Sequence, residues 1–91
     1  MANEVSRMIA AGASVVDVRT VDEFDDGHYP KARNIPVNEI MARMNEVGPK
    51  DKPVVVYCAS GARSALAAKL LKANGFTDVM NAGGIDDMPS A

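Results

Sequence analysis

The feature that most constrains the fold is a continuous apolar run at residues 53–57, Pro-Val-Val-Val-Tyr. No polar residue interrupts it, which is the pattern of a central strand covered on both faces. Residues 61–74, rich in Ala, Leu and Lys, follow after a short loop and favour a helix that stops at Gly75. A buried strand that leads directly into a helix predicts an α/β protein with a mainly parallel sheet.

The first third of the chain alternates between helix and strand signals in the same way. We expect a short helix that stops at Gly12 and a buried strand at residues 14–18. Thr20 and Glu23 have the spacing of a capping box, which predicts the start of a second short helix. A brief strand at residues 32–35 should follow.

The segment after Pro36 is expected to form an amphipathic helix. Its apolar face would be formed by residues at helical spacing, namely Val37, Ile40, Met41, Met44 and Val47. Residues 77–81 are the last expected strand, after which Gly83 and Gly84 should turn the chain into its tail.

Length and composition narrow the class of protein. The chain has 91 residues, so we expect a single domain over residues 1–91. The net charge is −2 without a block of like charges, which argues against nucleic acid as the partner. The longest uncharged run, residues 53–62, is far below the roughly 20 apolar residues that span a bilayer. No signal-peptide pattern opens the chain, and we therefore expect a cytoplasmic protein without membrane contact.

Cys58 is the single cysteine of the chain and His28 its single histidine. These two residues make neither an internal disulfide nor a zinc site, so we expect no metal and no cofactor. Cys58 stands at the carboxyl end of the predicted central strand, directly before the predicted helix, where open parallel sheets bind ligands. A free cysteine is also common as inert packing in a protein core. The residues around Cys58 decide whether it is a reactive thiol or only part of the core.

The Cys58 loop, residues 58–63, reads Cys-Ala-Ser-Gly-Ala-Arg. Its small side chains allow successive N–H groups to point at one spot, and the helix start beside it favours negative charge. Arg63 adds a permanent cation with a forked set of donors. The pattern therefore predicts a reactive thiolate inside an anion-binding cradle rather than inert packing.

Two reactions of such a thiolate remain open. His28 lies far away in sequence, so no Cys–His pair is predicted, and no second cysteine is present to resolve a disulfide. Transfer of sulfane sulfur and transfer of a phosphoryl group both suit a thiolate that attacks an anionic centre. Cysteine phosphatases place one more residue between Cys and Arg than the four that separate Cys58 from Arg63. The shorter loop favours a single added sulfur over a tetrahedral phosphate.

Taken in order, these segments resemble the motifs of the rhodanese family of sulfurtransferases, and the resemblance covers nearly the whole chain. The matching segments are the runs at residues 15–24, 27–36, 54–64 and 81–85, with the intervening helix carrying Ala65, Ala67, Ala68, Leu70 and Leu71 and ending in Gly75 and Phe76. The chain departs from the family pattern at Met88, where members often have Trp, and at Lys31, where a second Gly is often found.

The resemblance implies a three-layer α/β domain with a central, mainly parallel sheet of four to five strands and helices on both faces. It implies an enzyme of the thiosulfate sulfurtransferase type, in which Cys58 takes sulfur from a small-molecule donor such as thiosulfate and holds it as a persulfide. The acceptor would be cyanide or a thiol, including a protein sulfur acceptor. The implied substrate-binding residues are Ala59, Ser60, Gly61, Ala62, Arg63 and Ser64.

Two hydroxyl groups, one in the Cys58 loop and one directly after it, are further candidates for contact with the sulfur. Ser60 and Ser64 each have a hydroxyl that would donate a hydrogen bond to the persulfide. Ser64 has the alternative of only tying down the first turn of the helix.

Asp17 and Arg19 end the first predicted strand, on the same edge of the sheet as Cys58 if the strands are parallel. They would form an ion pair that supports the loop, or Arg19 would pair with Glu23 instead. The acidic cluster at residues 22–26 is interpreted as a solvated helix start, and His28 as a hydrogen-bonded turn residue.

Three functions thus remain open from the sequence. The first is a sulfurtransferase, the second a cysteine-dependent phosphatase or arsenate-type oxyanion enzyme, and the third a non-catalytic sulfur carrier or partner-binding module. Loop length favours the first over the second. Turnover with thiosulfate and cyanide would separate the first from the third.

Overall fold

Four parallel strands form the sheet at the centre of the molecule, which a computed structural model describes over residues 3–90. Their order across the sheet is β2-β1-β3-β4, and every neighbouring pair runs parallel. The strands are β1 (Ser14–Asp17), β2 (Arg33–Asn34), β3 (Val54–Cys58) and β4 (Val79–Gly84). The predicted α/β class with a mainly parallel sheet is confirmed.

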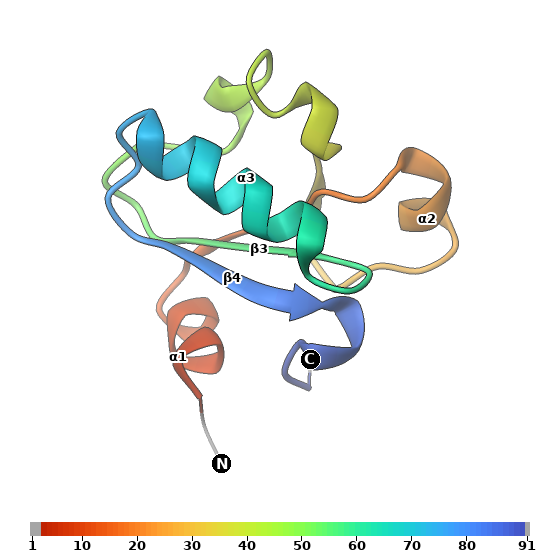
Figure 1. The fold of residues 1–91 in the computed structure, drawn as a ribbon. Coiled ribbons are helices and arrows are strands. Elements are labelled where there is room, and N and C mark those ends of the chain that lie inside the picture. Colours follow the sequence, from red (N-terminus) through yellow and green to blue (C-terminus); the bar gives the residue numbers. More distant parts are fainter. Residues whose placement is uncertain (1–2, 91) are drawn as a thin grey trace.

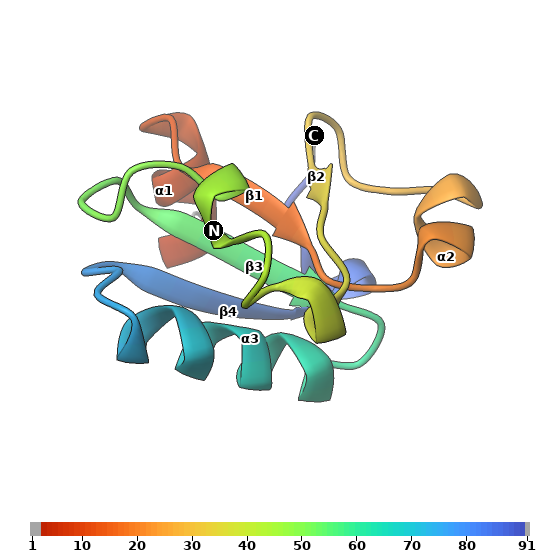
Figure 2. The same cartoon turned by 90° about the horizontal axis from the view of Figure 1, so that it is seen from above.

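Helices cover the two faces of this sheet, giving the expected three layers. The long helix α3 (Ala62–Ala73) lies on one face and α1 (Glu4–Ala10) on the other, while α2 (Val21–Asp25) stands beyond the carboxyl end of β1 (Figures 1 and 2). Within residues 3–90, the structure contains no helix with the length and apolarity to cross a bilayer.

The central strand β3 is buried along its whole length, as its composition predicts. Successive side chains of a strand point to opposite faces. Val54, Val56 and Cys58 belong to the core cluster that also contains Leu71 of α3. Tyr57 therefore points to the opposite face, the one that α1 covers (Figure 1). This alternation places the cysteine beneath α3.

The predicted amphipathic helix over the stretch that follows Pro36 is wrong as a continuous helix. The segment forms two short 3₁₀ helices, η1 (Val37–Glu39) and η2 (Met44–Glu46), joined by turns. A 3₁₀ helix has about three residues per turn, so residues three apart lie on the same side. Val37 and Ile40 share one side of η1 in this way, and Met44 and Val47 share one side of η2. An α-helix would group the same pairs. Met41, expected on the apolar face, is 55% exposed.

β4 is longer than expected, because Gly83 and Gly84 belong to the strand instead of turning the chain away. Gly84 is paired with Cys58, and a Cβ added at Gly84 would collide with the carbonyl oxygen of Ala59. Only glycine allows β4 to lie this close to the Cys58 loop. The two glycines thus bring the closing segment of the chain against the loop.

Candidate active site

Cys58 is the last residue of β3 and has no exposed surface. Its sulfur accepts a hydrogen bond from the N–H of Gly61 at 3.0 Å and from the N–H of Ser64 at 3.4 Å. The Ser64 hydroxyl also lies 3.4 Å from the sulfur. The loop therefore folds back over Cys58, with the first turn of α3 aimed at the sulfur.

These contacts act on the thiol in opposite directions. Burial is the largest single influence and raises the pKa of Cys58, because a buried thiolate loses its hydration. The hydrogen bonds from the Ser64 hydroxyl and from the N–H groups of Ser64, Gly61 and Ser60 favour the thiolate and together lower the pKa to about 7. A larger fraction of Cys58 is thus ionised at neutral pH than of a free thiol.

Gly61 makes this loop geometry possible. Its φ of 102° lies in the left-handed region, which residues with a Cβ rarely adopt. The residue also sits directly against the backbone of Gly83, 3.4 Å from the position that its own Cβ would take. The turn at Gly61 starts α3 at Ala62 and directs the first N–H groups of the helix toward Cys58.

Ser64 ties the loop to β4. Its side chain is fully buried, and its hydroxyl lies 2.6 Å from the Asn81 side-chain oxygen and 3.1 Å from the Gly61 carbonyl. A hydroxyl has one hydrogen to donate, so Asn81, Gly61 and the sulfur compete for it. Both roles considered for Ser64 are thus geometrically available, contact with the sulfur and fixation of the first helical turn. The expected hydroxyl contact of Ser60 remains a prediction.

Arg63 forms an ion pair with Glu23 of α2 at the solvent-exposed side of the Cys58 loop, which we call the mouth of the loop. Its two terminal nitrogens donate to the two carboxylate oxygens of Glu23 at 2.8 and 3.0 Å. Hydrogen bonding from Arg63, supported by Thr20, lowers the pKa of Glu23 to about 2. Glu23 is thus paired and not only solvated, whereas the other acidic residues of the cluster are exposed as expected, namely Asp22, Asp25 and Asp26.

Asp17 and Arg19 form the ion pair that was one of their two expected arrangements. Arg19 donates to Asp17 through Nε and Nη2, the latter at 2.7 Å, and not to Glu23. The Tyr57 hydroxyl donates to Asp17 at 2.7 Å and accepts from the N–H of Tyr29. Since Asp17 is paired in register with Tyr57, this cluster lies on the face of the sheet opposite to Cys58.

His28 lies in the irregular segment that follows α2, and its ring is within hydrogen-bond distance of a backbone carbonyl, as expected. Its ring stacks on Phe24 with centroids 3.7 Å apart, and Nδ1 lies 3.0 Å from the Phe24 carbonyl oxygen. The structure thus places His28 against α2, without a contact to Cys58.

Three residues were not singled out by sequence reasoning: two beside the Cys58 loop, Glu23 and Asn81, and one on the opposite face of the sheet, Tyr57. Glu23 was explained by its capping box, Tyr57 by its strand, and Asn81 by the run at residues 81–85 that matches the family. For Asn81 the nearby glycines were a usable signal, because a polar residue before Gly83 and Gly84 suggests close backbone contact with a loop. For Glu23 and Tyr57 no local signal pointed to their partners, since each partner lies 40 residues away along the chain.

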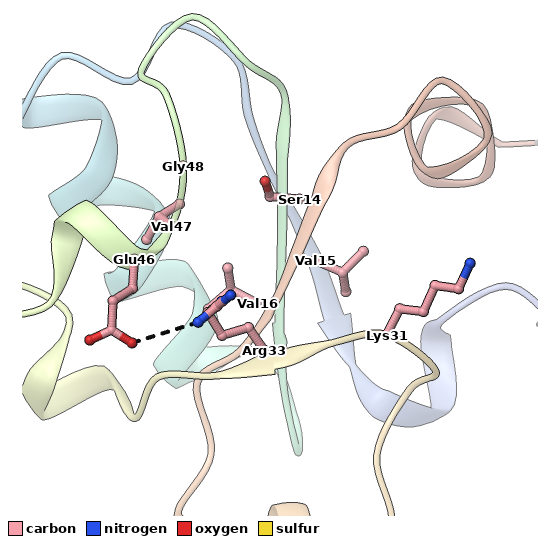
Figure 3. Close-up of a pocket in the computed structure, with 8 residues that line it drawn as sticks. All are labelled: Ser14, Val15, Val16, Lys31, Arg33, Glu46, Val47 and Gly48. Atoms are coloured by element: carbon pink, nitrogen blue, oxygen red, sulfur yellow. Dashed lines mark ion pairs between the residues drawn. The ribbon is translucent and has the colours of Figure 1, made fainter.

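A separate pocket of about 250 Å³ opens beside β1 and β2 (Figure 3). An ion pair of 3.8 Å between Arg33 and Glu46 forms part of its wall. None of its lining residues belongs to the Cys58 loop; they are Ser14, Val15, Val16, Lys31, Arg33, Glu46, Val47 and Gly48. Lys31 has a φ of 68°, left-handed backbone at the position where the family often has glycine. The pocket is distinct from the candidate active site.

A family model for the rhodanese-like domain matches residues 1–88, and the chain belongs to this family. The solved structure described as a rhodanese with anions from E. coli superimposes with a TM-score of 0.80 at 37% identity, covering 86% of this chain and 95% of that one. The human single-domain sulfurtransferase TSTD1 gives a TM-score of 0.76 at 28% identity, covering 89% and 84%.

Curated relatives carry sulfurtransferase names. The thiosulfate sulfurtransferase PspE of Escherichia coli is 38% identical over 74 residues, which are 80% of this chain and 71% of PspE. A sulfurtransferase of Allochromatium vinosum and the uncharacterized protein YqhL of Bacillus subtilis are each 45% identical, over 74% and 76% of this chain. The matches span 62% and 54% of these two relatives, so the chain corresponds to little more than half of each.

Proposed function

We propose that this protein is a sulfurtransferase that carries sulfane sulfur as a persulfide on Cys58. The Cys58 thiolate attacks the outer sulfur of a donor such as thiosulfate, the sulfur–sulfur bond of the donor breaks, and sulfite leaves with the bonding electrons. A thiolate or cyanide acceptor, small or on a protein, then attacks the outer sulfur of the persulfide. Cys58 leaves as the thiolate, ready for another cycle.

The observation that carries this proposal is the convergence of the loop and helix donors on the Cys58 sulfur. The N–H groups of Gly61 and Ser64 already donate to it. Among residues 3–90, no protein atom accepts a hydrogen bond from the N–H groups of Ala62 and Arg63, which begin α3. These groups are available to a charged outer sulfur or to the oxygens of a donor.

Loop length and family membership support sulfur over phosphate as the transferred group. Four residues separate Cys58 from Arg63, one fewer than in cysteine phosphatases. The relatives PspE of E. coli and GlpE of Shewanella oneidensis are named thiosulfate sulfurtransferases. The rhodanese of E. coli that superimposes on this chain is described with anions, which suits a cradle of N–H donors.

The proposal includes two further expectations. Residues 1–91 would act as a single domain, since the family model extends over residues 1–88. We also propose a cytoplasmic location, because the reducing pool there keeps a lone thiol free to accept sulfur and supplies thiol acceptors.

An intact-mass measurement after incubation with thiosulfate tests the proposal. We expect the protein to gain the mass of one sulfur atom and to lose it again on addition of cyanide, with thiocyanate released. Cys58→Ser is the matched control and should gain nothing. Sulfur uptake by Cys58→Ser, or hydrolysis of an aryl phosphate at rates comparable to thiosulfate turnover, would overturn the assignment. Uptake without turnover to any acceptor would instead identify a sulfur carrier.

A further inference from the structure

We infer that Glu23 is a specificity-determining residue that makes the Cys58 loop favour sulfur donors of low negative charge over dianions such as thiosulfate. The inference rests on the proposed sulfurtransferase function and concerns the donor that the same site accepts. It follows from the position of the Glu23 carboxylate, which occupies the paired donors of the only arginine in the Cys58 loop.

The Glu23 carboxylate is held in place from two sides. Arg63 binds both of its oxygens, and on the other side the Thr20 N–H and hydroxyl donate to Oε1 at 3.0 and 3.1 Å. Thr20 in turn accepts a hydrogen bond from the N–H of Glu23, which completes the capping box of α2. A carboxylate fixed by its own helix cap does not move aside freely when an anion approaches Arg63.

The charge at the mouth of the loop is therefore close to balanced. Both side chains of the pair are about one-third exposed, at 36% for Arg63 and 35% for Glu23, so they face the solvent from which a donor arrives. Glu23 stays ionised across the working pH range, because the Arg63 contacts keep its pKa near 2. An incoming anion meets the backbone N–H groups with little added attraction from Arg63.

The penalty from this carboxylate grows with the charge of the donor. A dianion that reaches Arg63 must replace or share the Glu23 carboxylate, and two negative groups then lie against one cation. A donor with one negative charge or none needs only the backbone N–H groups. Hydropersulfides and thiosulfonates, which hold a transferable sulfur with less charge than thiosulfate, fit the site better.

Glu23→Gln is the sharp test, because glutamine also serves at this position of a capping box and so keeps the start of α2 intact. Two donors with the same kind of transferable sulfur are compared, namely thiosulfate, a dianion, and methanethiosulfonate, a monoanion. We expect the KM for thiosulfate to fall about three- to tenfold. The KM for methanethiosulfonate should fall less, and kcat should change little for either donor.

Asp22→Asn is the matched control, since it removes the same charge from the same helical turn without a contact to Arg63. Its KM for thiosulfate should stay within about twofold of the parent value, as screening weakens charges that are not in contact. An unchanged or higher KM for thiosulfate in Glu23→Gln would overturn the inference. An equal fall for the two donors, or an equal fall in Asp22→Asn, would also overturn it.

The parent protein gives a second test that needs no substitution. With a balanced Arg63–Glu23 pair, added salt should leave the KM for thiosulfate unchanged or lower it. An unpaired cation at the loop would instead make salt raise that KM, which would contradict the inference. Absence of sulfur uptake on Cys58 from either donor would mark failure of the proposed function itself, and is distinguishable from all of these outcomes.

Discussion

At Cys58, burial raises the pKa of the thiol, whereas the surrounding hydrogen-bond donors lower it. The titration of Cys58 measures which of the two effects is larger. With the pKa lowered to about 7, the reactive thiolate fraction should rise through neutral pH and fall away below about pH 6. Iodoacetamide alkylation measured against pH should therefore show a midpoint near 7, below that of a free cysteine. The plateau rate should stay modest, because the side chain has no exposed surface.

Ser64→Ala separates the hydroxyl from the backbone donors in this effect. The Ser64 hydroxyl is the largest of the influences that lower the pKa of Cys58, so its removal should move the alkylation midpoint upward. Ser60→Ala is the control, because Ser60 acts on the sulfur through its N–H, which alanine keeps. An upward shift of the same size in Ser60→Ala would remove the hydroxyl as the cause.

Arg63 is the second residue whose role can be measured by substitution. Arg63→Ala would leave the Glu23 carboxylate unpaired beside the loop, where its negative charge would repel an anionic donor from the backbone N–H groups. We expect the transition state to lose about 1.5–3 kcal/mol of stabilisation, which corresponds to roughly a ten- to a hundredfold fall in kcat/KM with thiosulfate. Arg63→Lys keeps the charge but loses the fork that matches a carboxylate or a sulfonate, so it should lose part of that activity.

Adding Glu23→Gln to Arg63→Ala should restore some of the lost efficiency, since it removes the unpaired charge. Thiosulfate kinetics of the two single variants and the double variant measure this coupling. If Arg63→Ala keeps full activity, the backbone N–H groups are the whole anion site.

At the scale of elements, local signals in the sequence predicted most of what forms. The β-branched run became β3, the Ala- and Leu-rich segment became α3, and the Thr20–Glu23 capping box opens α2. These predictions succeed because each depends on neighbours within a few residues. The stretch after Pro36 failed because two 3₁₀ turns and one α-helix place nearly the same apolar residues on one side, so periodicity alone did not distinguish them.

Contacts between residues far apart in the chain could not be predicted from the sequence, because no local pattern indicates them. The capping box fully accounts for Glu23 locally, and nothing nearby indicates that its carboxylate also binds Arg63, 40 residues later. Gly83 and Gly84 favour a turn in the sequence because glycine is common in turns. In the structure, glycine is needed at position 84 because a Cβ there would collide with the Ala59 backbone. Cys58 and its loop were predictable because the nucleophile, the small residues and the arginine are contiguous.

Gly84→Ala tests whether β4 supports the Cys58 loop. The φ of Gly84 is −91°, which any residue adopts, so the substitution acts through the collision with the Ala59 backbone alone. Overpacking of this kind costs about 1–3 kcal/mol of unfolding free energy, measured by urea denaturation. The displaced loop should also weaken the hydrogen bonds to the sulfur and raise the alkylation midpoint of Cys58.

Gly12→Ala is the comparison for this variant, because it also places a methyl group on a glycine but has open space around it. Its φ of 96° makes the substitution strained, so stability should fall while the titration of Cys58 stays unchanged. A normal titration in Gly84→Ala would mean that β4 does not position the loop.

At the scale of the whole molecule, the buried cluster of Asp17, Arg19 and Tyr57 joins segments that are far apart along the chain. It links β1 to β3 through the Tyr57 hydroxyl, and to the segment after α2 through the Gly27 carbonyl, which accepts from Arg19 at 2.7 Å. Because the cluster lies on the face opposite to Cys58, we assign it to stability, with support of the loop only through β3. Arg19→Met should therefore destabilise the fold without changing the chemistry.

Removing the Arg19 side chain leaves the fully buried Asp17 carboxylate with two donors among residues 3–90, the Tyr57 hydroxyl and the backbone N–H of residue 19. Breaking a buried pair in this way costs about 3–5 kcal/mol, whereas an exposed pair contributes about 1 kcal/mol or less. Arg7→Met, at an exposed pair with Glu4, is the matched control for urea denaturation. At temperatures where Arg19→Met remains folded, its alkylation midpoint and thiosulfate KM should equal those of the parent. A changed midpoint in the folded variant would instead place Arg19 in the electrostatics of the Cys58 site, acting through the sheet from its opposite face.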